Sequence, residues 1–124
     1  MDKDLSARVM RDMDPELLEF LQLYVDSFVK WDLLYFFHEN PHTIDTVENI
    51  ARYAGRTPAA VHSALQELAQ RRLLEETEMG EMVVYALTPN PQKRAQLEQF
   101  IRAGEDRQFR VKAIFHMVRG VGDD

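Results

Sequence analysis

The chain has 124 residues, of which 45% are hydrophobic and none is cysteine, and its formal net charge is −6. This length suits one globular domain with an ordinary core. Without cysteine, it can form no disulfide framework, thiolate metal site or cysteine nucleophile. The N-terminal residues contain no apolar signal core, and the longest apolar runs are too short to span a bilayer. We therefore expect a cytoplasmic protein that makes no contact with a membrane.

The first helical region runs from Asp14 to about His38. An aspartate before Pro15 is typical of a helix start, and a second cap near Asp26 and Ser27 predicts a break into two helices. Aromatic side chains follow the second part at helical spacing: Phe28, Trp31, Tyr35, Phe36 and Phe37. This spacing favours a place in the core or in an interface, and the alternative is an aromatic-lined effector pocket.

The next segment, Val47 to Leu68, has the spacing of a helix-turn-helix. A small residue at Ala51 lets two helices cross closely, Gly55 can take the positive φ that closes the first helix, and Val61 fills the angle between the helices. Further helix starts are expected where Asp45 and Glu48 have capping-box spacing, and where Thr57 precedes Pro58.

A β-hairpin is expected after the second of these helices. Two strand-like runs, Leu73 to Glu78 and Met82 to Leu87, flank a turn that carries Gly80. The short segment Thr43 and Ile44 could add a single strand to this hairpin. The predicted order is therefore helix, short strand, helix, helix, hairpin.

Elements in this order, over roughly residues 27–88, resemble the winged helix-turn-helix domains of bacterial transcriptional regulators, including the MarR and ArsR types. The resemblance implies a mostly α (α+β) fold that binds double-stranded DNA. Residues 1–26 would be an N-terminal tail and helix, and residues 89–124 would be C-terminal helices used for dimerisation.

The C-terminal region supports this division. Asn90 before Pro91 predicts a helix to about Ala103, and a second helix is expected from about Asp106 to Arg119. These helices and the N-terminal one carry more apolar surface than a winged domain needs, so we expect a homodimer. The alternative is that they pack on each other within one chain. The residues expected in the dimer interface are Phe109, Ile114, Phe115 and Val118.

The resemblance also assigns roles in DNA binding. The second helix would enter the major groove and the arginines near it would reach phosphates. The expected base-facing residues are Thr57, Ala59, His62, Ser63 and Gln66, and the expected phosphate contacts are Arg52, Arg56, Arg71 and Arg72. Gln66 is the best base reader, because its amide can pair bidentately with adenine. A polar face that merely meets solvent is the simpler interpretation of the same residues.

Charge is unevenly distributed along the chain. Residues 49–74 carry four bases and one acid, whereas the hairpin residues 75–88 carry four acids and no base. A phosphate-contacting wing is seldom acidic, so the alternative function is a protein-interaction or adaptor module that binds a partner through the wing.

Other chemistry has little support in the sequence. His38 and His42 are four residues apart, but Pro41 ends the helix between them, so we expect no metal site. We find no glycine-rich phosphate loop, serine elbow or paired carboxylates in an apolar setting, and therefore expect neither an enzyme nor a cofactor. The favoured function is that of a sequence-specific DNA-binding transcriptional regulator.

Overall fold

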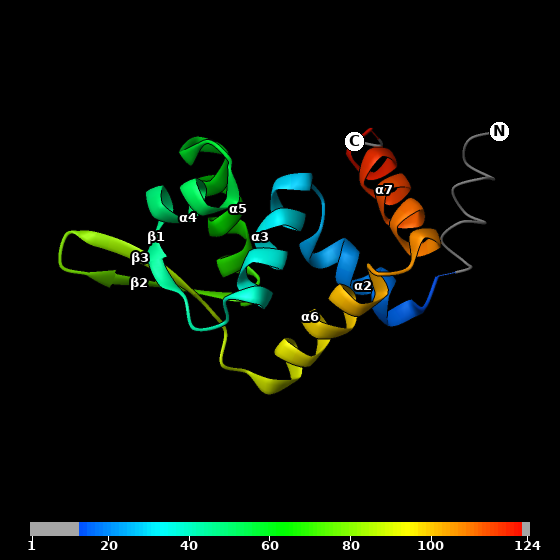
Figure 1. The fold of residues 1–124 in the computed structure, drawn as a ribbon, viewed down its shortest axis with the longest axis horizontal. Helices are drawn as coiled ribbons and strands as arrows, with labels where there is room; N and C mark the ends of the chain where they lie inside the picture. Colours follow the sequence, from blue (N-terminus) through cyan, green and yellow to red (C-terminus); the bar gives the residue numbers. More distant parts are fainter. Residues whose placement is uncertain (1–12, 123–124) are drawn as a thin grey trace.

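The computed structural model describes residues 13–122, which form six helices and one three-stranded sheet (Figure 1). The elements, in chain order, are α2 (Pro15–Tyr24), α3 (Phe28–Glu39), β1 (Ile44–Thr46), α4 (Val47–Ala54), α5 (Pro58–Gln70), β2 (Leu74–Met79), β3 (Met82–Leu87), α6 (Pro91–Ala103) and α7 (Arg107–Gly122). In Figure 1 the β2–β3 hairpin, the wing, projects at one end of the molecule, α7 and α2 lie toward the other, and α6 runs from the middle toward α7. The mostly α, winged helix-turn-helix prediction is confirmed.

Polar side chains begin most helices where the sequence predicts. The Asp14 carboxylate accepts the Glu16 N–H at 2.8 Å. The Ser27 hydroxyl accepts the Lys30 N–H at 3.2 Å, so the expected break between α2 and α3 is present. Asn90 likewise caps α6. Each cap satisfies an N–H group that has no partner within its own helix.

The predicted capping box at α4 is wrong. Thr46, not Asp45, is the N-cap, and its hydroxyl accepts the Asn49 N–H at 3.4 Å. Asp45 lies in β1, and its carboxylate accepts the Thr46 N–H and the side-chain amide of Asn49 at 2.8 and 2.7 Å. Because β1 runs directly into α4, the residue beside the helix takes the capping position.

The sheet is antiparallel in the order β1-β3-β2. Ile44 is opposite Ala86 and Leu74 is opposite Leu87, so the short strand predicted before α4 pairs with the hairpin. β1 and β2 each begin one residue later than expected. At the tip of the wing Gly80 has φ of 65°, a conformation that favours glycine in a tight turn.

Gly55 closes α4 in the left-handed conformation, with φ of 69°. A Cβ built at this position meets no atom within 4 Å, so backbone conformation rather than space requires glycine here. Ile50 and Ala51 from α4 and Val61 from α5 are all buried beneath the turn. Ala51, Gly55 and Val61, the three positions of the predicted motif, therefore have the structural roles that the sequence predicts.

Aromatic rings from α2, α3 and α7 pack around Phe100 of α6. Its ring lies 5.1 Å from that of Phe20, 5.2 Å from Trp31, 6.2 Å from Tyr35 and 6.2 Å from Phe109, measured between ring centroids. Core packing, the favoured interpretation of the aromatic stripe, therefore applies to much of it. These contacts join α2, α6 and α7 to α3 of the winged region.

Candidate nucleic-acid interface

One face of α5 is open to solvent. Four predicted base-facing residues on this helix are exposed: Ala59, His62, Ser63 and Gln66. The intervening positions are buried against α3, α4 and the sheet: Val61, Ala64, Leu65 and Leu68. The buried side chains anchor α5 to the core, and small or hydrogen-bonding side chains remain on its exposed face. Gln70, which the sequence analysis did not select, extends this face by one turn.

Thr57 has a structural task at the start of α5. Its hydroxyl accepts the Ala60 N–H at 3.4 Å as the N-cap of the helix. The residue is exposed, but its oxygen already satisfies a free N–H group of the first turn. The structure therefore places Thr57 beside the other predicted contacts and gives it a capping role.

The two arginines near the start of α5 differ in their partners. Arg52 on α4 is exposed and donates to the Asn49 side chain within its own helix at 2.8 Å. Arg56, in the turn before α5, donates through Nε at 2.9 Å and through Nη2 at 2.5 Å to one carboxylate oxygen of Asp32 on α3. A phosphate would have to compete with Asp32 for Arg56, whereas Arg52 has only a neutral partner.

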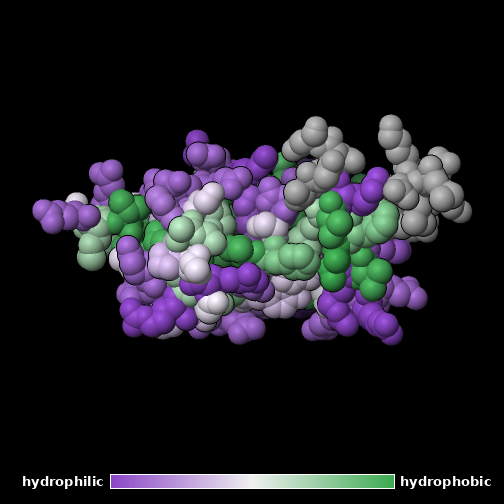
Figure 2. Space-filling model, turned by 90° about the horizontal axis from the view of Figure 1, so that it is seen from above, coloured by the Kyte–Doolittle hydropathy of each residue, from purple (hydrophilic) through white to green (hydrophobic). Residues whose placement is uncertain are grey.

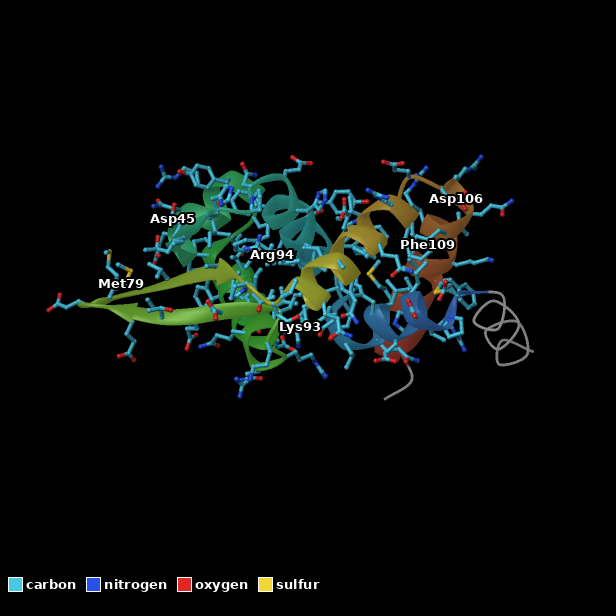
Figure 3. The ribbon with its side chains drawn as sticks, turned by 90° about the horizontal axis from the view of Figure 1, so that it is seen from below. Asp45, Met79, Lys93, Arg94, Asp106 and Phe109 are labelled. Carbon is cyan, nitrogen blue, oxygen red and sulfur yellow. The ribbon has the colours of Figure 1, made fainter. Side chains whose placement is uncertain are left out.

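Arg71 and Arg72 are exposed at the opposite end of α5. The helix has 13 residues, which corresponds to a length of about 20 Å, so cationic side chains stand at both ends of the exposed face. Lys93 of α6, labelled in Figure 3, adds a third cation here because its ammonium donates to the Arg71 carbonyl at 3.1 Å. Lys93 was not predicted, since it lies 22 positions after Arg71 in the sequence and gives no local signal.

A groove separates the start of α5 from the wing. It has a volume of about 520 Å³ and is lined by Ala59 and His62 on one side and by Glu81, Met82 and Val83 on the other. The exposed wing tip therefore combines acidic and apolar side chains. Figure 3 shows Met79 at this tip, at the far end of the molecule from Phe109.

One acidic residue of the wing, Glu76, accepts a hydrogen bond within the sheet. The Tyr85 hydroxyl donates to Glu76 Oε2 at 2.5 Å across the β2–β3 pair. Burial raises the pKa of Tyr85, and the bond to the Glu76 carboxylate raises it further. Glu78 and Glu81 are exposed nearer the tip, so they determine the charge that the wing would present to a ligand.

The residues predicted for dimerisation have two different environments. Phe109 is 7% exposed and packs against Phe100 within the same chain. Ile114 and Val118 on the other side of α7 are 41% and 61% exposed, as is Val111 at 58%, and Phe115 is partly buried. Figure 2 shows hydrophobic surface at this end of the molecule as well as near the wing.

Neither a metal cluster nor a membrane span is found between residues 13 and 122. No group of three or more histidine or carboxylate residues in that range could hold a metal ion, and His38 and His42 have no third ligand there. No helix in the same range is long and apolar enough to cross a membrane.

Comparison with known proteins supports the fold. Residues 27–80 match the model of the MarR family. The crystal structure of the AntR antimony-specific transcriptional repressor is similar with a TM-score of 0.57 and 24% identity, over 76% of this chain and 87% of that one. A possible transcriptional regulator from Methanosarcina mazei Go1 is similar at 10% identity and a TM-score of 0.47, over 86% and 82% of the two chains. No curated protein sequence matches.

None of these comparisons points to the adaptor module, which was the alternative function. The matched residues begin at the cap of α3 and end in the wing, so they contain the open face of α5 and its supporting helices. Residues 27–80 thus form a winged helix-turn-helix that matches the MarR family of DNA-binding regulators.

Proposed function

We propose that α5 reads the major groove and that the protein binds operator DNA as a homodimer without an enzymatic activity. One observation carries the base-reading role: the Gln66 side chain is exposed at the centre of the α5 face and makes no hydrogen bond to any of residues 13–122. A free amide in this position can pair bidentately with adenine. His62 and Ser63 lie beside it, one turn nearer the start of the helix.

Phosphate contacts would flank this base-reading face. Arg52 lies at one end, and Arg71, Arg72 and Lys93 lie at the other. Such contacts position the helix on DNA but carry no direct sequence information. Arg56 would contribute less in this arrangement, because Asp32 already neutralises it.

The homodimer would form through the open side of α7. Val111, Ile114 and Val118 follow one another at helical spacing and leave apolar surface exposed. A twofold dimer also matches two half-sites on a palindromic operator. Phe109 is left out of this interface because it is buried within the chain.

The antimony specificity belongs to the AntR repressor named above. The present chain has no cysteine, so our proposal includes no thiolate site for a soft metal or metalloid ion.

The test is selection of bound sequences from random DNA duplexes near physiological salt. We expect an enriched, palindromic site, and we expect Gln66→Ala to weaken binding to that site by about 1–3 kcal/mol. Gln96→Ala, at an exposed position on α6, is the matched control and should bind normally. If no sequence is enriched, the base-reading proposal is wrong.

A further inference from the structure

Among residues 13–122, Lys30 of α3 is the most completely buried charged residue. It is 4% exposed, and Thr88 is the other buried polar residue in that range. The neighbouring core positions Leu33 and Leu34 are fully buried. Removing an ammonium from water is costly unless it is paired. Nothing in DNA contact explains a lysine at this site, because the side chain points into the protein.

Two carboxylates from different elements pair with this ammonium. Lys30 Nζ lies 2.8 Å from Asp26 Oδ1 in the α2–α3 turn and 3.2 Å from Glu67 Oε1 on α5. The carboxylate side chains are 59% and 50% exposed, respectively, so the buried partner is the lysine alone. The ammonium thereby ties α3 and the α2–α3 turn to α5, the helix that we propose faces DNA.

The same contact reaches the exposed face of α5. The second oxygen of Glu67 accepts a hydrogen bond from the Ser63 hydroxyl at 3.5 Å, one turn earlier on the helix. With the Ser63 proton directed to Glu67, the hydroxyl oxygen would present lone pairs as an acceptor. Lys30, Glu67 and Ser63 therefore form a chain of contacts from the core to a predicted base-facing residue.

The C-terminal helix approaches the other end of this chain. Burial lowers the pKa of the partly buried His116 on α7, and the Leu21 backbone and the charge of Asp26 oppose part of that shift. His116 therefore lies near the α2–α3 turn, whose Asp26 pairs with Lys30.

Stability alone does not account for this arrangement. Replacing a buried ion pair by apolar residues of similar volume is often neutral or stabilising, and retained pairs can instead specify one conformation. Methionine would fill the space of the Lys30 side chain without its charge. If the Lys30 charge adds little to stability, its role is better explained by the residues that it holds in position.

We infer that Lys30 is a positioning residue for DNA recognition: it fixes α5 and the Ser63 hydroxyl through Glu67 without touching DNA. This inference rests on the function proposed above. It predicts that the charge at Lys30 affects the choice between DNA sequences. The non-specific attraction to phosphates would be independent of it.

The test compares Lys30→Met with wild type in the full-length protein. We expect little change in the melting temperature, because the Asp26 and Glu67 carboxylates left behind are 59% and 50% exposed and stay hydrated. The salt dependence of non-specific binding should also be unchanged, because no phosphate contact is lost. The ratio of specific to non-specific affinity should fall by about tenfold, the size of one typical coupling within a contact network. Arg102→Met, which breaks the exposed Arg102–Glu98 pair on α6, is the matched control and should leave the ratio unchanged.

A double mutant tests the route. If Lys30 acts through Ser63, Lys30→Met combined with Ser63→Ala should lose no more selectivity than the more affected single variant. Fully additive losses would contradict the relay. Unchanged selectivity in Lys30→Met would overturn the positioning role altogether.

Hydrogen exchange separates this inference from the proposed function. In the free protein, Lys30→Met should increase amide exchange in the second half of α5, whereas Arg102→Met should not. If wild type enriches no DNA sequence, the proposed function fails, but faster exchange in α5 would still support the tie made by Lys30. Unchanged exchange would contradict the tie, whatever the DNA result.

Discussion

The two open faces of the molecule differ in chemistry. On α5 the exposed side chains are small or hydrogen-bonding, as at Ser63 and Gln66, and cations lie at both ends of the helix. On α7 the exposed side chains are aliphatic, as at Val111 and Val118. The first face suits the edges of bases with phosphates beside them, and the second suits another protein surface. The composition of each face is our reason for proposing DNA as the partner of α5 and a second subunit as the partner of α7.

The same change, valine to aspartate, tests this comparison at one position on each helix. Val61 is fully buried in α5, and Val118 is 61% exposed on α7. Val61→Asp would bury an unpaired carboxylate and should cost several kcal/mol or unfold the protein. Val118→Asp should change stability of the folded subunit little, but should shift the protein from dimer to monomer. Thermal melting and light scattering measure the two effects.

Two results would contradict this expectation. Equal melting temperatures for Val61→Asp and wild type would mean that α5 does not pack as described. A monodisperse wild-type monomer at micromolar concentration would show that the aliphatic face of α7 has another use.

Local patterns were sufficient to predict most of the fold. The spacing of Ala51, Gly55 and Val61 and the caps at Ser27 and Asn90 each depend on residues a few positions apart, and the structure has them in place. The error at α4 has a local cause as well, since both Asp45 and Thr46 can cap a helix and only the end of β1 decides between them.

The partners of the site residues could not be predicted in this way. Arg56 meets Asp32 across 24 positions, and Lys30 meets Glu67 across 37. From the sequence alone, Arg56 is a cation without a partner and Lys30 is a charge within an apolar run. Both acquire their carboxylate partners only when α3 packs beside α5. The exposed face of α5 was found because its periodicity is local, whereas its electrostatic environment depends on distant residues.

The acidic wing allows a second test of the α5 face. If the wing lies along DNA, Glu78→Lys combined with Glu81→Lys should strengthen non-specific binding. Each new phosphate contact should add about 0.9 to the slope of log affinity against log salt. Glu98→Lys combined with Glu105→Lys makes the same change in net charge on the outer helices. Binding titrations at several salt concentrations would distinguish the pairs, and equal slopes would place the wing away from the phosphates.

The smallest expected effect concerns His116 on α7, near the α2–α3 turn. Burial lowers the pKa of its imidazole below the ordinary value of 6.5, although the Leu21 backbone and Asp26 oppose part of that shift. The unfolded chain therefore binds more protons at this residue, so stability is greatest above pH 6.5 and falls as the pH decreases through the lowered pKa. His116→Gln should reduce the slope of melting temperature against pH in that window. His42→Gln, at an exposed site, should not. Parallel curves for His116→Gln and wild type would mean that α7 packs more loosely around this residue than its burial indicates.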